Sequence, residues 1–322
     1  MPKKKLKIGV LFGGKSAEHE VSLQSAQNVI KALNKNKYEI VPLKINKDGK
    51  FDFDIVKKFD VIFPVLHGPF GEDGSMQGLL KLAGVPFVGP SVLGSAVGMD
   101  KDVMKKLLKE AGIPIGKFMT FLHIDKLDFG KIKKELGLPL FIKPANMGSS
   151  VGISKIKNED EFKSAVKKAL KYDTKIVVEE FIKGREIECS VLGNEYPTAS
   201  LPGEIVANQD FYSYNAKYID TGSVAVIPAK IDKKIAKLVQ DMAVKTFRVL
   251  NCEGLSRVDF FLKDNGEVYV NEINTIPGFT NISMYPKLWE ASGLPIKKLL
   301  DKLISLAIER FKRESKLKTT VL

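Results

Sequence analysis

The sequence contains few cysteines and few arginines, and each scarcity excludes a class of protein. Two cysteines in 322 residues, Cys189 and Cys252, cannot form a disulfide framework, and they fit a reducing cytoplasm. The formal net charge is +13, yet only five of the 51 basic residues are arginine, and the lysines are spread over the expected solvent faces of helices. Because nucleic-acid binders gather Arg and Lys on one face, we expect no nucleic-acid partner.

Long apolar runs are also missing. No segment approaches the ~18 residues of a membrane span. The basic start, MPKKKLKIGVLF, runs directly into a strand pattern without the small-residue cleavage site of a signal peptide. We therefore expect a cytoplasmic protein without a membrane partner. The first strand is not followed by GxGxxG either, so the dinucleotide-binding fingerprint is absent.

The stretch KPANMGSSVG, residues 143–152, looks like a phosphate loop but lacks the Walker order, in which the glycines precede the lysine. Here Lys143 comes first. Taken alone, Gly148 and Gly152 favour a simple turn over a nucleotide site. Lys143 lies in the apolar run LPLFIKPA, however, and a lysine in a central strand needs a partner, which disfavours an ordinary surface role for it.

The hydrophobic pattern changes along the chain. Residues 1–90 alternate strands and helices, which predicts a parallel sheet covered by helices. We expect VPFVG, residues 85–89, to add a strand and GPSVLGSAVG, residues 89–98, to form a Gly-rich joint. Asp100 is the expected N-cap of the next helix. Residues 203–225 show no helical period, and long irregular stretches of this kind are usually functional or disordered.

The stretch SRVDFFLKDNGEVYVNEIN predicts a β-hairpin closed by a two-residue Asn-Gly turn. This register places Asp259 opposite Glu272 and Arg257 opposite Asn274, with all four side chains on one face. Two facing carboxylates would repel each other at ~5 Å, and a divalent cation relieves that repulsion. The hairpin alone leaves two readings open, a magnesium site or a solvated face on which Arg257 pairs with a carboxylate. The exposed backbone amides of the following TIPGFTNIS turn favour a site that holds an oxyanion.

At this point the residues resemble the ATP-grasp family and, within it, the D-alanine–D-alanine ligases. Any single match would be weak, but eight stretches in family order span nearly the whole chain. The matching stretches are GGKSAEHEVS (13–22), HGPFGEDG (67–74), GMDK (98–101), KPANMGSSVG (143–152), VEEFIKGRE (178–186), FYSYNAKY (211–218), RVDFF (257–261) and NEINTIPGFTNIS (271–283).

The resemblance implies a combined α/β and α+β architecture. An N-terminal parallel, Rossmann-like (pre-ATP-grasp) domain would occupy residues 1–95. An ATP-grasp fold of two α+β subdomains, residues 96–182 and 183–322, would follow and clasp ATP, with a lid loop at 203–225. The family resemblance also implies a homodimer.

The resemblance further implies that ATP lies between two sheets, with lysines on its phosphates and the loop folded over them through backbone N–H groups. Glu179 and the backbone of Phe181 and Ile182 would take the adenine, and Glu186 would take the ribose. The residues implied for ATP binding are Lys101, Lys143, Ser149, Ser150, Val151, Glu179, Phe181, Ile182, Glu186, Phe211 and Lys217.

The implied reaction is the ligation of two D-alanine molecules through a D-alanyl phosphate, with ADP and phosphate released. Two Mg²⁺ ions, with Mn²⁺ as an alternative, would be held by Asp259, Glu272 and Asn274. The residues implied in catalysis are Glu18, His67, Ser149, Tyr218, Arg257 and Gly278, and those implied in substrate binding are Glu18, His67, Tyr218, Arg257, Gly278, Ser283 and Met284.

Several alternatives stay open. His67 has two readings of similar weight, a substrate contact and a strand-end histidine bonded to backbone. The second substrate could be D-lactate or D-serine, although Tyr218 in the lid favours the dipeptide by family analogy. A nucleotide- or nucleic-acid-binding module without catalysis is disfavoured because the phosphate lysines and the metal-binding residues of the family are all retained.

Overall fold

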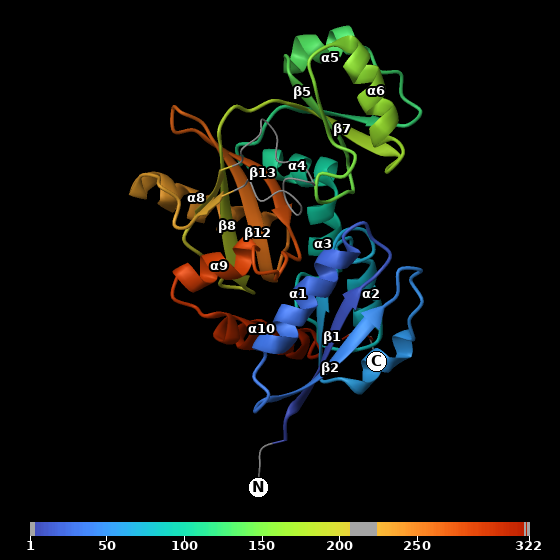
Figure 1. Ribbon diagram of the computed structural model, residues 1–322, viewed down its shortest axis with the longest axis vertical. Coiled ribbons are helices and arrows are strands. Elements are labelled where there is room, and N and C mark those ends of the chain that lie inside the picture. The colour runs from blue at the N-terminus through green and yellow to red at the C-terminus, as the bar shows by residue number, and fades with distance from the viewer. Residues whose placement is uncertain (1–3, 207–223, 319, 321–322) are drawn as a thin grey trace.

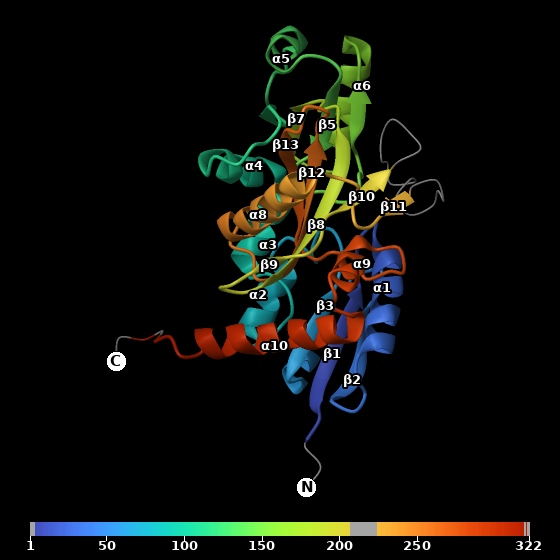
Figure 2. The same cartoon turned by 90° about the vertical axis from the view of Figure 1, so that its left-hand side faces the viewer.

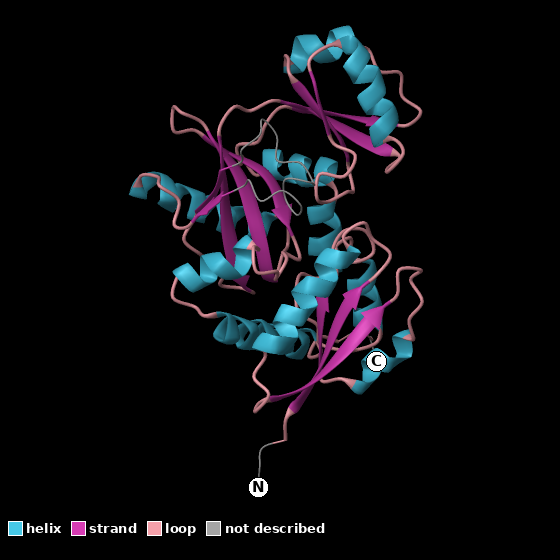
Figure 3. Ribbon diagram, viewed as in Figure 1, coloured by secondary structure: helices cyan, strands magenta, loops and turns pink. Residues whose placement is uncertain are grey.

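The structure of the protein is a computed structural model that describes residues 4–206, 224–318 and 320. Three sheets with their helices follow one another along the chain (Figures 1 and 3). Phe211, Lys217 and Tyr218 lie outside the described residues, so the predictions made for them stay predictions. Among the described residues, no helix is both long and apolar enough to cross a membrane.

The first sheet is parallel and has strand order β2-β1-β3. Its two faces bury different sets of side chains: Val61, Phe63 and Val65 face one core, and Ile62 faces another. Strands buried on both faces need helices on both sides, as the sequence pattern predicts. The elements are β1 (Leu6–Gly13), α1 (His19–Ala32), β2 (Tyr38–Ile45), the 3₁₀ helix η1 (Phe53–Lys58), β3 (Val61–Val65) and α2 (Ser75–Leu82).

The second sheet is antiparallel, with strand order β4-β7-β5-β6, and two helices cover one of its faces (Figure 1). Two further helices, α3 (Val92–Met99) and α4 (Lys101–Glu110), connect it to the first sheet. The elements of this unit are β4 (Phe118–Leu122), α5 (Phe129–Leu136), β5 (Leu140–Pro144), β6 (Ser154–Ile156), α6 (Glu159–Ala169) and β7 (Lys175–Glu180).

The third sheet has strand order β11-β10-β8-β12-β13, with β9 paired to β8. Its core includes Met104 and Leu108 of α4, so that helix packs on this sheet. The elements are β8 (Arg185–Gly193), β9 (Thr198–Ala199), β10 (Gly203–Val206), β11 (Val224–Val226), α8 (Lys233–Val249), β12 (Gly254–Leu262), β13 (Val268–Asn274), α9 (Met284–Ala291) and α10 (Ile296–Glu314).

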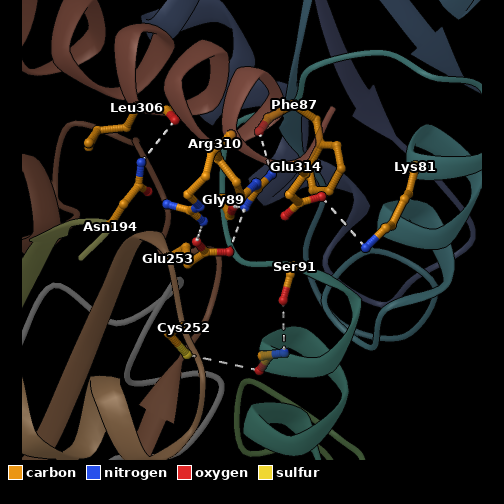
Figure 4. A network of polar contacts seen from close by, with 12 residues as sticks. Lys81, Phe87, Gly89, Ser91, Asn194, Cys252, Glu253, Leu306, Arg310 and Glu314 are labelled. Carbon is orange, nitrogen blue, oxygen red and sulfur yellow. Dashed lines mark hydrogen bonds and ion pairs between the residues drawn. The ribbon is translucent and has the colours of Figure 1, made fainter. Parts of the chain in front are cut away.

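The C-terminal helix α10 returns to the first sheet and contributes to its core (Figure 2). Arg310 of α10 is 4% exposed, and its Nη2 donates a hydrogen bond of 2.8 Å to the carbonyl of Phe87. Its Nη1 donates to the carbonyl of Gly89 at 2.5 Å and lies 3.8 Å from Oε2 of Glu253 (Figure 4). One side chain therefore connects α10 to the segment that leaves the first sheet and to the start of β12.

Three local predictions differ from the structure. Residues 85–89 contribute one isolated bridge, Ile62 with Phe87, because the next hydrogen bonds of a parallel ladder would need N–H groups from Pro64 and Pro90, which have none. The Gly-rich joint is the helix α3, capped by Ser91 and packed so closely that a Cβ on Gly94 would lie 2.6 Å from a carbonyl oxygen. Two ends of the 203–225 stretch form the paired strands β10 and β11.

Candidate active site

A polar cavity of about 130 Å³ lies between the first sheet, the third sheet and the loop after β5. Its lining combines loops of the first sheet, the start of α4, the Gly-rich loop after β5 and the open face of β12–β13. The sequence-predicted residues that line it are Glu18, His67, Lys101, Ser149, Arg257, Glu272, Asn274, Gly278, Ser283 and Met284. Residues predicted to act on both substrates of a ligation are thus gathered around one space.

The hairpin has the predicted register at the site and a different register at its turn. Asp259 pairs with Glu272 and Arg257 with Asn274, as predicted. The two-residue turn is wrong: Lys263 and Glu267 close a three-residue loop through a 2.9 Å hydrogen bond. A bulge between Asp259 and Phe260, where Asn271 is the extra residue on β13, restores the register.

Arg257 binds the carboxylate of Asp259 with two hydrogen bonds of 2.7 Å. Its Nε also lies 3.0 Å from Oε2 of Glu188, which pairs directly with Asp259 across β8 and β12. Our sequence reasoning missed Glu188. The available signal was the spacing of Glu188 from Glu186, a predicted site residue on the same strand. Residues two apart on a strand share a face.

The metal-binding prediction fits the chemistry of the residues present. The amide oxygen Oδ1 of Asn274 is buried and has no hydrogen-bond partner among the described residues. Glu272 lies beside it with Oε2 3.8 Å from Nζ of Lys101. No group of three His, Cys, Asp or Glu side chains within residues 4–206 and 224–318 forms a complete cage. Such an open set of oxygen donors suits Mg²⁺, which completes its shell with water and phosphate oxygens.

Lys101 begins α4, and its position follows from the cap before it. Asp100 accepts hydrogen bonds from the backbone of Asp102 at 3.0 Å and Val103 at 3.1 Å, which confirms the predicted N-cap. The Lys101 side chain is 7% exposed, and its Nζ donates a 2.7 Å hydrogen bond to the carbonyl of Met147. This contact ties the phosphate-binding candidate to the Gly-rich loop.

The Gly-rich loop reaches the first sheet through Ser149, whose hydroxyl donates a hydrogen bond to Oε1 of Glu18. Glu18 is buried at the start of α1. Ser149 and Ser150 have φ of 49° and 61°, a left-handed conformation that is uncommon for residues other than glycine. Such backbone strain is typical of ligand-binding loops and turns successive N–H groups in one direction.

Lys143 and Glu179 form a buried pair on the neighbouring strands β5 and β7. Nζ of Lys143 lies 3.0 Å from Oε2 of Glu179, and Nζ of Lys105 lies 3.3 Å from the same oxygen. Burial would raise the pKa of Glu179, but the two lysines hold that pKa below its ordinary value. Burial lowers the pKa of Lys105, and the carboxylate of Glu179 opposes that shift. Lys105 was missed in the sequence, although it lies one helical turn after Lys101.

The remaining predicted ATP residues that the structure describes come from three segments: the end of β7, β8 and the Gly-rich loop. Phe181 follows β7, and its ring centroid is 6.1 Å from that of Phe141 and 4.1 Å from Nζ of Lys155. Ile182 is buried. Glu186 on β8 pairs with Phe261. Val151, also predicted for ATP, is half-buried in the Gly-rich loop.

His67 lies between the first sheet and the loop after β13. Its Nδ1 is 3.1 Å from the carbonyl of Ile276, so Nδ1 carries the proton, while Nε2 is buried without a partner among the described residues. Burial lowers the pKa of His67, but Glu72, 3.9 Å away, and Glu18 raise it by more, so the pKa lies above its ordinary value. The backbone contact of one sequence reading is therefore present, and His67 also lines the cavity, where the substrate contact of the other reading stays a prediction.

The loop after β13 ends in a compact turn. Oγ of Ser283 accepts a 2.9 Å hydrogen bond from the backbone of Thr280, and a Cβ on Gly278 would lie 2.9 Å from that Oγ. Ser283 directly precedes α9, whose first residue is the buried Met284. The helix N-terminus and the Ser283 hydroxyl thus face the cavity together, a combination that suits a carboxylate.

Two family models cover most of the chain. The D-ala D-ala ligase N-terminus matches residues 7–55 and 53–90, and the D-ala D-ala ligase C-terminus matches residues 107–305. A D-alanine–D-alanine ligase of Oceanobacillus iheyensis is 50% identical over 98% of this chain and 99% of its own length.

Solved structures agree with this match. The VanG D-Ala:D-Ser ligase of Enterococcus faecalis superposes with a TM-score of 0.86 at 39% identity, over 94% of this chain and all of that one. A D-alanine–D-alanine ligase of Bacillus anthracis, solved in complex with ATP, gives a TM-score of 0.83 at 32% identity, over 96% and 99% of the two chains. The predicted ATP-grasp fold is thereby confirmed, and the chain belongs to the D-alanine–D-alanine ligase family.

Proposed function

We propose that this protein is an ATP-dependent ligase that joins two D-alanine molecules into D-alanyl-D-alanine for peptidoglycan precursor synthesis, releasing ADP and phosphate. The observation that carries the proposal is a shared cavity. In it Glu18, a carboxylate that can bind an ammonium group, faces the basic and acidic groups of β12 and β13. Its family membership supports the same reaction.

In the first step, the ammonium group of one D-alanine is held by Glu18, and its carboxylate oxygen attacks the γ-phosphorus of ATP. The bond from that phosphorus to the ADP oxygen breaks, giving D-alanyl phosphate and ADP. Phosphoryl transfer depends mainly on positioning and charge neutralisation. Lys101, fixed at the start of α4 and bonded to the Gly-rich loop, supplies a positive charge next to the transferred group.

Asp259, Glu272 and Asn274 are the residues that would hold Mg²⁺. When bound, the metal supplies charge neutralisation for the phosphate oxygens. The unpartnered Oδ1 of Asn274 and the facing carboxylates support this role.

In the second step, the amine of the second D-alanine attacks the carbonyl of D-alanyl phosphate. Arg257 and the N–H of Gly278 border the cavity and would stabilise the negative charge that develops on the carbonyl oxygen. The α9 N-terminus with Ser283 would hold the second carboxylate. The C–O bond then breaks, the attacking nitrogen gives up a proton that leaves with the phosphate, and the peptide bond remains.

The nucleotide would lie between the second and third sheets. Lys143 would bind phosphate, Glu179 and the backbone of Phe181 and Ile182 would take adenine, and Glu186 would take ribose. The ATP complex of the Bacillus anthracis relative supports the nucleotide assignment.

The same proposal includes the domain boundaries 96–182 and 183–322, a lid role for Tyr218, Phe211 and Lys217, and a homodimer.

The second substrate is tested by competition, because the VanG relative carries D-Ala:D-Ser ligase in its name on the same fold. ADP release is measured with D-alanine alone, and then with D-alanine plus D-serine or D-lactate, and the products are weighed by mass spectrometry. We expect full turnover with D-alanine alone. Turnover only with a mixed pair would favour the alternative ligase. It would overturn the argument that Tyr218 indicates the dipeptide as product.

A further inference from the structure

Lys105 is a buried lysine to which the proposed reaction gives no task. It is 1% exposed, the lowest exposure of any lysine among the described residues. It lies one turn after Lys101 on α4, and its Nζ is 5.9 Å from the ring centroid of Phe118. A lysine is almost never buried this completely without a partner, and the partner here is Glu179.

The two oxygens of Glu179 have different surroundings. Oε2 lies 3.3 Å from Nζ of Lys105 and 3.0 Å from Nζ of Lys143. Oε1 is buried and has no hydrogen-bond partner among the described residues. An unpaired buried carboxylate oxygen is costly, so this oxygen is suited to accept a hydrogen bond from a ligand.

Only one of the two lysines is placed to leave. Lys143 lies at the end of β5, next to the Gly-rich loop, and is proposed to bind phosphate. When its ammonium group turns to a phosphate, Glu179 loses one of its two partners. A buried carboxylate without any cation would be strongly destabilised or would take up a proton. Lys105, fixed on α4 and more deeply buried, stays behind.

We propose that Lys105 is a positioning residue that keeps Glu179 anionic and oriented while Lys143 moves to the phosphates, so that Oε1 accepts the exocyclic amino group of adenine. Lys105 would then determine the base preference without touching the nucleotide. This inference rests on the proposed function, because it takes ATP as the ligand of this region.

The test separates base recognition from phosphate recognition. Affinities for ADP, IDP and AMP are measured by calorimetry. IDP carries a carbonyl where ADP carries the amino group, so it presents an acceptor to Oε1. For Lys105→Met we expect the ADP-over-IDP preference to fall by about tenfold, which corresponds to one charge-assisted hydrogen bond, with the ADP-over-AMP ratio changed by less than about twofold. For Lys143→Met we expect the reverse pattern.

Two controls show whether Lys105 acts through Glu179. In a Glu179→Gln background, Lys105→Met should produce no further loss of base preference, because coupled residues are not additive. Lys109→Met, an exposed lysine of the same helix, should keep both ratios. If Lys105→Met does not fold, Lys105→Gln is measured in the same way, since it removes the charge and keeps a polar group.

The outcomes distinguish this inference from the proposed function. A wild-type protein that prefers ADP, together with a Lys105→Met variant that keeps the full preference, would overturn the role of Lys105 alone. A wild-type protein that binds neither ADP nor IDP would overturn the ATP assignment, and this inference with it.

Discussion

Arg257 and Asp259 lie two residues apart on β12 and form a fork of two 2.7 Å hydrogen bonds. Each partner has another proposed task, oxyanion stabilisation for Arg257 and metal binding for Asp259. A carboxylate that binds a guanidinium with both oxygens is less available to a cation. Metal binding should therefore compete with this pair and release Arg257 towards the reacting carbonyl.

Replacing Arg257 by lysine should separate the two effects. For Arg257→Lys we expect kcat to fall by about 10²–10³, the usual cost of losing an oxyanion donor. We also expect the Mg²⁺ concentration at half-maximal rate to fall, because lysine cannot hold both oxygens of Asp259. Turnover measured against Mg²⁺ concentration gives both values. Arg248→Lys, on the outer face of α8, should behave like the wild type; an unchanged kcat in Arg257→Lys would contradict the oxyanion role.

Gly68 should be required for binding the first D-alanine. Its φ is 74°, and a Cβ there would lie 2.8 Å from Oγ of Ser16 and 2.9 Å from Oε2 of Glu18. Gly84 has a similar φ of 68°, but no described atom lies within 4 Å of its Cβ position. Both alanine variants should lose about 1–2 kcal/mol of stability from the left-handed backbone.

Only Gly68→Ala should also displace Glu18. We expect its KM for the first D-alanine to rise by about tenfold, the effect of weakening one charged contact, while Gly84→Ala keeps the wild-type KM. Initial-rate kinetics with both variants give the comparison. Equal KM values in the two variants would show that Glu18 does not hold the substrate amine.

His67 should titrate above the ordinary histidine pKa of 6.5, because Glu72 and Glu18 outweigh the effect of its burial. Since its folded-state pKa is raised, its contribution to stability is fully present below pH 6.5 and is lost as the pH rises through the folded pKa. The chain has three histidines, so an NMR titration compared with a His67→Gln variant assigns the resonance. A midpoint below 6.5 would contradict this electrostatic environment.

Arg310 should stabilise the junction between α10 and the first sheet. Arg310→Met removes the hydrogen bonds to Phe87 and Gly89 and leaves Glu253 without this partner. Glu253 keeps Arg313, so the cost comes mainly from the two lost hydrogen bonds, and a hydrogen bond to a charged group contributes about 1.5–3 kcal/mol. We expect a lower urea midpoint for Arg310→Met and a wild-type midpoint for Lys312→Met, an exposed residue of the same helix. A wild-type midpoint in Arg310→Met would show that α10 docks through its apolar face alone.

The sequence could predict the alternating elements of the first sheet, because they follow from local periodicity. The pairing of Asp259 with Glu272 was predicted from a two-residue turn, and it is correct because a bulge compensates for the longer turn. The sequence could not predict the bulge at Asn271, since that extra residue offsets a three-residue turn and leaves the site register unchanged. The return of α10 to the first sheet depends on contacts between residues far apart in the chain. Glu188 and Lys105 were missed because their spacing from Glu186 and Lys101 places each on one face of its strand or helix but does not show whether that face is buried.

The most direct test of the proposed reaction follows one oxygen atom. The protein is incubated with Mg²⁺, ATP and D-alanine that carries ¹⁸O in its carboxylate, and both products are weighed. We expect D-alanyl-D-alanine together with one ¹⁸O in the released phosphate for each dipeptide formed, because the attacking carboxylate oxygen leaves with phosphorus. Dipeptide formed without ¹⁸O in the phosphate, or no dipeptide at all, would contradict ligation through D-alanyl phosphate.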